Sequence, residues 1–296
     1  MSEEFRIVAV IGKYRSTDVS GSVAAMAAFL RDRGIEVWIE AGTAQLGGNE
    51  AGHRVASIEE IGEYADLVIV LGGDGSMLTA ARALGMHQLP LVGVNQGRLG
   101  FLTDVSHAEM FDRVGEILDG RYLRERRSLL EVELWREGLH LRTAMALNDI
   151  VLSRGEIGRM IEFELSVDGE YIYTQRSDGM IIATPTGSTA YALSANGPIL
   201  HPRLAGIVLV PLCPHALTYR PLALAQDSVV ELKVLGDRAR DAVVHCDGQT
   251  IVEVGRGDVL RILRSDHGVT LLHPEGYSYF NVLREKLHWS AVPDLS

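Results

Sequence analysis

The stretch that decides the fold of the first part of the chain is Leu67-Val68-Ile69-Val70-Leu71-Gly72-Gly73-Asp74-Gly75-Ser76. Five consecutive apolar residues followed at once by glycines indicate a strand that is apolar on both faces, as strands of a buried parallel sheet are. Three similar apolar runs stand at residues 7–11, 37–39 and 91–94. A helical pattern over 22–33, and a capping box (Ser57-x-x-Glu60) that opens 57–64, predict helices between these strands. The alternation predicts right-handed βαβ units and a parallel sheet.

We therefore expect an α/β domain with a Rossmann-like parallel sheet over residues 1–122, in which the glycine-rich residues 41–54 form a loop. The pattern changes after about residue 120, where apolar residues alternate at period two, as in 130–134 and 163–167. Turn-forming pairs such as Asp168-Gly169 and Asp247-Gly248, and the triplet 266–268, recur between such runs. They predict an all-β, sandwich-like domain over 123–272. The helix-like tail, 273–296, is expected to pack back on the first domain.

The composition excludes several classes of protein. With 47% hydrophobic and 23% charged residues, the chain falls in the range of soluble globular proteins. Its formal net charge of −11 argues against a general nucleic-acid or anionic-membrane binder, because both need a basic face. Only two cysteines, no apolar run near ~20 residues, and an acidic start unlike a signal peptide predict a cytoplasmic protein without a membrane partner.

The turn 72–76 stands at the carboxyl end of a parallel strand, where open α/β sheets bind ligands. Glycine lets backbone N–H groups approach a phosphate, and a helix starting near Ser76 would add its positive end. The Asp74 carboxylate repels phosphate, so it suits a metal ion or a hydroxyl that attacks the phosphate. The simpler alternative is a tight turn with Asp74 or Ser76 as helix cap. The chain lacks the P-loop pattern and a strand-coupled G-x-G-x-x-G, which argues against those nucleotide-binding classes.

Two further features could form a nucleoside pocket. The apolar strand 180–183 ends in a Pro/Gly turn dense in hydroxyls, where Ser188 or Thr189 could cap a following helix. In the pair Asn148-Asp149, the amide can hydrogen bond to an adenine edge and the carboxylate can accept two ribose hydroxyls. Taken singly, the first also fits a strand–turn–helix junction and the second a turn.

Together the three features resemble the bacterial type of the ATP-dependent NAD kinase family. That family carries a GGDG turn, an Asn-Glu or Asn-Asp pair, and a long block that reads here Arg176-Ser177-Asp178-Gly179-Met180-Ile181-Ile182-Ala183-Thr184-Pro185-Thr186-Gly187-Ser188-Thr189-Ala190-Tyr191. Residues 95–104, 158–164 and 277–281 are also similar. GGDG-like turns occur in phosphofructokinases and diacylglycerol-type lipid kinases as well, whereas the TPTGSTAY block separates NAD kinases from both.

The resemblance implies that NAD⁺ is bound between the two domains and that ATP, with Mg²⁺ or another divalent metal, phosphorylates the 2′-hydroxyl of its adenosine ribose. Asp74 would be the catalytic base at that hydroxyl, and Gly75 would bring its backbone to the pyrophosphate. Asn148 and Asp149, which is glutamate in many members, would hold the adenosine half. The other substrate-binding residues implied are Gly73, Arg159, Arg176, Asp178, Thr189, Ala190, Tyr191, Ser194 and Gln249.

Within that set, residues 189–194 would line the nucleobase pocket. Arg176 and Asp178 would act near the nicotinamide, with Asp178 reaching across a subunit interface of a homodimer or homotetramer. The metal ligands are not assigned. Two alternatives stay open at this stage: a GGDG-type lipid or sugar kinase, and a non-catalytic sensor that binds NAD.

Overall fold

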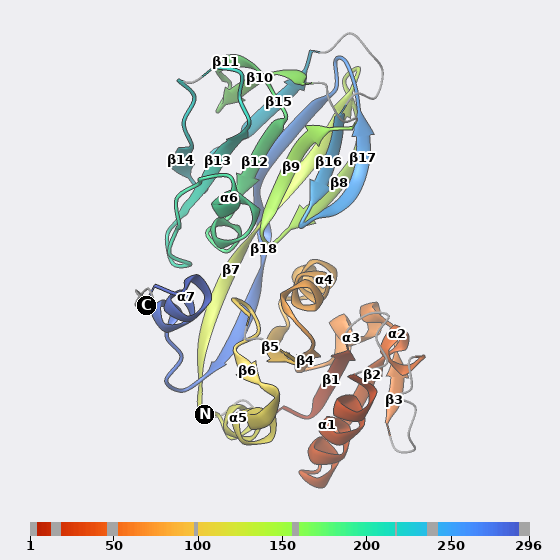
Figure 1. Cartoon of the computed structure of the whole chain (residues 1–296). Coiled ribbons are helices and arrows are strands. Elements are labelled where there is room, and N and C mark those ends of the chain that lie inside the picture. Colours follow the sequence, from red (N-terminus) through yellow and green to blue (C-terminus); the bar gives the residue numbers. More distant parts are fainter. Residues whose placement is uncertain are drawn as a thin grey trace. The chain divides into compact units, whose positions relative to one another are not determined.

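The computed structural model describes residues 5–12, 19–45, 53–97, 100–155, 160–216, 218–235 and 242–289. The chain divides into two compact units (Figure 1). Unit 1 comprises Met1–Arg126 and Val269–Ser296, and unit 2 comprises Arg127–Gly268. Two long strands, β7 (Tyr122–Arg136) and β18 (Val259–Pro274), have residues in both units.

Unit 1 is an α/β domain around a parallel sheet. Its strands follow the order β3-β2-β1-β4-β5, and every neighbouring pair is parallel. The C-terminal part of β18 joins β5, also in parallel, and β6 pairs with β5. The strands are β1 (Ile7–Gly12), β2 (Glu36–Glu40), β3 (Arg54–Ala56), β4 (Leu67–Leu71), β5 (Pro90–Asn95) and β6 (Val105–Ser106). All five residues of β4 are buried, as its apolar run predicted.

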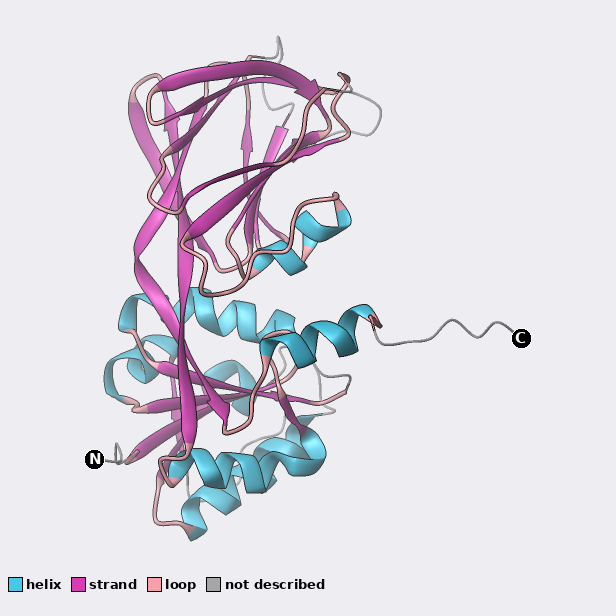
Figure 2. Ribbon diagram, turned by 90° about the vertical axis from the view of Figure 1, so that its left-hand side faces the viewer, coloured by secondary structure: helices cyan, strands magenta, loops and turns pink. Residues whose placement is uncertain are grey.

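Helices cover both sides of this sheet (Figure 2). Helices α1 and α5 bury Met26, Leu30 and Ile117 in one core cluster with β1, β4 and β5. The helices are α1 (Ser20–Asp32), α2 (Ala41–Ala44), α3 (Ile58–Tyr64), α4 (Asp74–Leu84), α5 (Met110–Leu118) and α7 (Tyr279–Leu287), with 3₁₀ turns η2 (Gly85–His87) and η3 (His107–Glu109). The capping box of α3 is present as predicted, with Ser57 and Glu60 each bonded to the other's backbone N–H. The tail helix α7 belongs to unit 1, as expected for a segment that packs back on the first domain.

Unit 2 is a sandwich of two sheets. One sheet follows the order β14-β13-β12-β9-β16-β17, with antiparallel neighbours. The other contains β11, β10, β15, β18, β7 and β8. The remaining bounds are β8 (Leu139–Ala146), β9 (Asp149–Arg154), β10 (Ile161–Val167), β11 (Glu170–Ser177), β12 (Gly179–Ala183), β13 (Gly206–Leu212), β14 (Leu222–Ala225), β15 (Val230–Val234), β16 (Ala242–Cys246) and β17 (Gln249–Val254). The alternating residues of 130–134 and 163–167 meet in the core between the sheets, which confirms the α/β plus β-sandwich fold class.

Two local expectations are wrong. Helix α2 and the first residue of β3 lie within 41–54, because the Glu40 carboxylate caps α2 by accepting hydrogen bonds from the N–H groups of Gly42 and Thr43. Residues 266–268 form no turn but lie inside β18. By contrast, Asp168-Gly169 and Asp247-Gly248 turn as predicted, with positive φ at all four residues.

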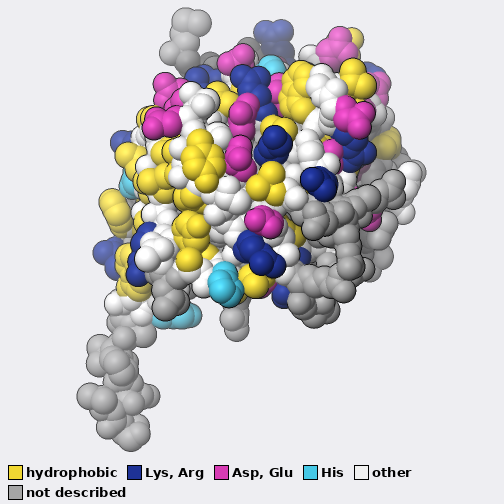
Figure 3. Space-filling model, turned by 90° about the horizontal axis from the view of Figure 1, so that it is seen from above, with side chains coloured by type: hydrophobic (Ala, Val, Ile, Leu, Met, Phe, Trp, Pro, Cys, Tyr) yellow, Lys and Arg dark blue, Asp and Glu magenta, His cyan; other side chains and the backbone are white. Residues whose placement is uncertain are grey.

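One face of the surface carries side chains of every kind. On the face seen in Figure 3, acidic, basic and hydrophobic side chains are interspersed. Among the described residues, no helix is both long and apolar enough to span a membrane.

Candidate functional site

Asp74 stands at the first position of α4, directly after the turn that follows β4, and its carboxylate is held by a crossing segment of unit 1. Its Oδ2 accepts a hydrogen bond from the Phe101 N–H at 2.8 Å. Its Oδ1 accepts from the Leu102 N–H at 3.0 Å and from the Thr103 hydroxyl at 3.1 Å. Two carboxylate oxygens offer about four lone-pair positions, so a fourth donor can still be accepted, at Oδ2. Asp74 is therefore oriented by the protein and not consumed as a helix cap.

The N-cap is instead Gly73, and α4 has no side-chain cap hydrogen bond, so neither Asp74 nor Ser76 is the N-cap. A Cβ built on Gly73 or Gly75 would meet no atom within 4 Å. The φ of Gly73 is −97°, which any residue adopts. Neither the space around these two positions nor the backbone conformation of Gly73 therefore requires a glycine.

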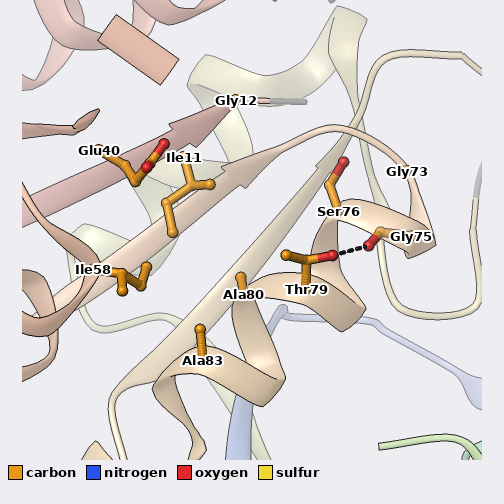
Figure 4. Close-up of a pocket in the computed structure, with 10 residues that line it drawn as sticks. All are labelled: Ile11, Gly12, Glu40, Ile58, Gly73, Gly75, Ser76, Thr79, Ala80 and Ala83. Carbon is orange, nitrogen blue, oxygen red and sulfur yellow. Dashed lines mark hydrogen bonds between the residues drawn. The ribbon is translucent and has the colours of Figure 1, made fainter. Parts of the chain in front are cut away.

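Both glycines line a cavity of about 530 Å³ in unit 1 (Figure 4). The cavity lies at the carboxyl ends of β1 and β4 and runs along α4 from its N-terminus to Ala83. Its other lining residues are Ile11, Gly12, Glu40, Ile58, Ser76, Thr79, Ala80 and Ala83. The mixture of apolar side chains, two hydroxyls and exposed backbone at a helix N-terminus suits a ligand with a flat apolar part and an anionic part.

In unit 2, the predicted pair Asn148-Asp149 sits where three neighbouring strands of one sheet end together. β12 ends at Ala183 opposite Asp149, and β16 ends at Cys246 opposite Ile150. The Thr184 hydroxyl donates to the Leu147 carbonyl at 2.6 Å, and the Thr184 N–H donates to the Asn148 carbonyl at 2.9 Å. The sheet thereby brings the pair beside the segment that follows β12.

Asp247, which the sequence did not single out, clamps the same pair from the other side. Its carboxylate accepts hydrogen bonds from the N–H groups of Leu147, Asn148 and Asp149, at 3.0, 2.7 and 3.2 Å. A Cβ on Gly187 would lie only 2.0 Å from the Asn148 carbonyl oxygen, so the 184–187 turn needs glycine to close on the pair. The turn pair Asp247-Gly248 was the available signal, but its long-range partner was not visible in the sequence.

The clamp leaves Asp149 in an unusual electrostatic state. The residue is only 4% exposed, and no described residue donates a hydrogen bond to its carboxylate. Burial first, and then the nearby Asp247 carboxylate, raise the pKa of Asp149 to about 7. A buried acid with a strongly raised pKa and no donor is typical of a binding or catalytic site.

The hydroxyl-rich segment forms a 3₁₀ turn, η4 (Gly187–Thr189), followed by the single-turn helix α6 (Tyr191–Ser194). Neither Ser188 nor Thr189 caps a helix, because their hydroxyls donate to the carbonyls of Pro185 and Thr186. Tyr191 and Ser194 are exposed one helical turn apart, with Thr189 and Ala190 half-buried beside them. Gln249 is exposed at the start of β17, next to the Asp247-Gly248 turn. These residues gather at the same end of the sheet as Asn148 and Asp149.

Arg176 and Asp178 do not lie at the end of the sheet that holds Asn148 and Asp149. They precede β12, whose five residues put its two ends roughly 13 Å apart. Asp178 pairs with Arg154 at 3.0 Å, and Arg176 is exposed on β11. Arg159 lies outside the described residues.

The comparisons with known proteins agree with the motifs. Residues 8–122 match the ATP-NAD kinase N-terminal domain, and residues 147–273 match the ATP-NAD kinase C-terminal domain. An NAD kinase of Aromatoleum aromaticum is 59% identical over 99% of this chain and 97% of that relative. An NAD kinase of Thiobacillus denitrificans is 46% identical, covering 98% and 99%. The chain belongs to the ATP-NAD kinase family.

Solved structures support the same ATP-NAD kinase fold. A crystal structure of an Archaeoglobus fulgidus NAD kinase in complex with ATP has a TM-score of 0.73 and 25% identity, covering 95% of this chain and 98% of that one. Yeast NADH kinase complexed with NADH has a TM-score of 0.90 at 23% identity, covering 99% and 90%, and this likeness speaks to the fold alone. None of these comparisons supports a lipid kinase, a sugar kinase or a non-catalytic sensor.

The described part of this ATP-NAD kinase family member holds no group of three His, Cys, Asp or Glu side chains able to bind a metal ion. Mg²⁺ is commonly held by one or two carboxylates together with substrate phosphates. A Mg²⁺ ion that enters with a nucleotide needs no such group of three side chains among the described residues.

Proposed function

We propose that this protein transfers the γ-phosphoryl group of ATP to the 2′-hydroxyl of the adenosine ribose of NAD⁺, giving NADP⁺ and ADP. The observation that carries the proposal is the pair Gly73 and Gly75, which the fold does not require and whose missing side chains open the backbone to the cavity. A ligand that must approach that backbone closely explains both glycines, and a phosphate group is such a ligand.

The cavity in unit 1 is proposed as the ATP site. Its volume of about 530 Å³ is in the range of ligand pockets of 300–1,000 Å³. Ile11, Ile58 and Ala80 offer apolar contact to a base, while the N-terminus of α4 and the backbone of Gly73 and Gly75 face the phosphates. Among the residues that the structure describes, no lysine or arginine lines the cavity. We propose that Mg²⁺ supplies charge neutralisation for the phosphoryl transfer.

The adenosine half of NAD⁺ is proposed to bind unit 2, at the shared end of β9, β12 and β16. The buried Asp149 carboxyl is available to ribose hydroxyls, because no described residue donates a hydrogen bond to it. The Asn148 side chain and the exposed ring of Tyr191 add an amide and a stacking surface for a base. We propose Thr189, Ala190, Ser194 and Gln249 as further contacts there, and Arg159, Arg176 and Asp178 as contacts from elsewhere.

Asp74 is proposed to orient the 2′-hydroxyl and to accept its proton. Phosphoryl transfer has a loose transition state, so positioning outweighs early deprotonation of the alcohol. The three hydrogen bonds from residues 101–103 fix the carboxylate and leave Oδ2 able to accept the hydroxyl. Because the transition state is loose, the transfer of the hydroxyl proton to Asp74 is expected late in the reaction.

The test is purified protein with Mg-ATP and NAD⁺, coupled to an NADP-specific dehydrogenase. The wild type should produce NADP⁺, and Asp74→Asn should lower kcat by at least ~10²-fold, in the range for loss of a positioned acid–base group. Dinucleotide binding, measured by calorimetry, should survive, since we place its contacts mainly in unit 2. An inactive wild type would refute the proposed activity, and a near-normal Asp74→Asn would remove Asp74 from the chemistry.

We further propose a cytoplasmic location, since Cys213 and Cys246 are both free thiols.

A further inference from the structure

We propose that His273, near the C-terminal end of β18 in unit 1, is a positioning residue for the phosphoryl transfer. It would act through Asp104, which ends the segment 101–104 whose donors hold the Asp74 carboxylate. The inference rests on the role proposed for Asp74.

The segment 101–104 is closely fitted around Asp74. The Thr103 hydroxyl donates to Asp74 Oδ1 and accepts a hydrogen bond from the Asn95 side-chain N–H at 2.9 Å. A Cβ on Gly100 would lie 1.9 Å from Asp74 Oδ1. A Cβ on Gly93 would lie 2.7 Å from the Leu102 carbonyl oxygen. Because there is so little free space, a small shift of this segment also moves the hydrogen-bond donors that orient the Asp74 carboxylate.

His273 holds the far end of the segment. Its side chain is 1% exposed, and its Nδ1 lies 2.9 Å from Asp104 Oδ2. Because an ionised carboxylate only accepts hydrogen bonds, Nδ1 carries the proton in this contact. The side chain of Asp104 is 6% exposed, so the bond is shielded from water.

Two further groups fix the imidazole. Its Nε2 lies 3.3 Å from Glu125 Oε2 of β7, and the Tyr277 ring stacks on it at 3.8 Å between centroids, with 8° between the planes. His273 thus ties the C-terminal strand β18, the strand β7 and the stacked tail ring to the segment next to Asp74. The stacked aromatic pair and the contact with Asp104 make one rotamer of His273 strongly preferred.

The experiment compares two amide replacements. In His273→Asn, the amide nitrogen stands near the place of Nδ1 and can still donate to Asp104. In His273→Gln, the amide nitrogen stands near the place of Nε2 and reaches toward Glu125 instead. Both variants lose the imidazole ring and its stacking on Tyr277, so a difference between them does not come from the loss of that stacking.

We expect His273→Gln to lower kcat by about 10²-fold, the size expected when a reacting group is misplaced by about 1 Å. The KM values for ATP and NAD⁺ should stay unchanged. His273→Asn should retain most of kcat, and Asp104→Ala, which removes the acceptor for Nδ1, should lower kcat as His273→Gln does. The double variant Asp104→Ala/His273→Gln should be no slower than the slower single variant, because both act through one contact.

A second readout does not depend on activity. The amide hydrogens of Phe101 and Leu102 are bonded to Asp74, so their exchange with deuterium reports on this contact. We expect faster exchange there in His273→Gln and wild-type exchange in His273→Asn. This result holds even if the natural substrate differs from NAD⁺, which separates failure of the inference from failure of the proposed function.

The control is Asp258→Asn in unit 2. It likewise disrupts the hydrogen bonding of a buried carboxylate, because Asp258 is 2% exposed and accepts two bonds of 2.7 Å from Arg136. It should lower the melting temperature without lowering kcat. Equal kcat losses in the Asn and Gln variants of His273, or none in Gln, would overturn the proposal and leave His273 a packing residue. If His273→Gln does not fold, Asp104→Ala decides, and wild-type kcat and exchange there would equally overturn it.

Discussion

Asp149 has a carboxylate whose charged form the fold disfavours. Burial and the neighbouring Asp247 raise its pKa to about 7. Between pH ~4 and ~7 the folded protein therefore binds this proton while the unfolded chain has released it. Free energy of unfolding must fall as the pH rises through that window, and it levels off above pH ~7. A site that keeps such a group without a donor of its own is arranged for a ligand that brings hydroxyl donors.

Replacing the group tests this. Asp149→Asn should remove the loss of stability between pH 4 and 7, which the shift puts on the order of 4 kcal/mol. At pH 8 the unliganded variant should thus be more stable than the wild type in urea unfolding, while its affinity for NAD⁺ falls.

Asp258→Asn is the matched control, because the pKa of Asp258 is shifted in the opposite direction to that of Asp149. Although burial favours its neutral acid, the hydrogen bonds from Arg136 and Gly255 lower the pKa of Asp258. Its contribution to stability is present above pH ~4 and lost as the pH falls through the lowered pKa. This variant should therefore be less stable than the wild type at pH 8. A destabilised Asp149→Asn at pH 8 would contradict the electrostatic account.

At the scale of an element, the glycine in the first turn of α4 is explained by the approach of a ligand and not by the stability of the helix. Gly75 is the second residue of α4, and glycine there weakens a helix by up to about 1 kcal/mol relative to alanine. Nothing within 4 Å of its missing Cβ opposes a side chain. We therefore expect Gly75→Ala to leave the melting temperature equal or higher, while the KM for ATP rises sharply because a methyl group enters the phosphate approach.

Gly21→Ala is the matched control, because Gly21 is also the second residue of a helix, α1, and also has nothing within 4 Å of its missing Cβ. It should give the same change in melting temperature with no change in KM. Thermal unfolding and initial rates at varied ATP separate the two variants. Unchanged ATP kinetics in Gly75→Ala would argue against the cavity as the ATP site.

At the scale of the whole molecule, we predict a homodimer or homotetramer. The strands β11 and β14 each form an edge of a sheet in unit 2, and Tyr171, Ile172 and Leu222 on them are exposed. Open edges with exposed apolar side chains are usually covered, and a second copy of the chain is the partner we expect. Light scattering should give two or four times 32.3 kDa.

The double variant Ile172→Glu/Leu222→Glu should shift that mass toward the monomer, because charges at an edge oppose pairing. A fully active wild-type monomer at working concentration would contradict the prediction.

What the sequence determined by itself is local in origin. The run 67–71 predicted a buried strand, because five consecutive apolar residues are typical of a strand that is covered on both faces. Ser57 and Glu60 marked a helix start because both partners of a capping box stand within four residues. The GGDG turn, the Asn-Asp pair and the TPTGSTAY block are also contiguous, so the family and the fold class followed from them.

Only the tertiary structure decided which contacts those residues make. Asp74 meets residues 101–103, Asp247 clamps residues 147–149, and Asp178 pairs with Arg154. Each contact joins positions more than twenty residues apart, and nothing in either local sequence specifies the other. Helix α2 escaped prediction for a related reason, since its cap is a glutamate side chain at the end of a strand. Local patterns reflect backbone propensity and hydrophobic periodicity, whereas the partners of polar side chains are set by strand order, which brings distant ends of the chain together.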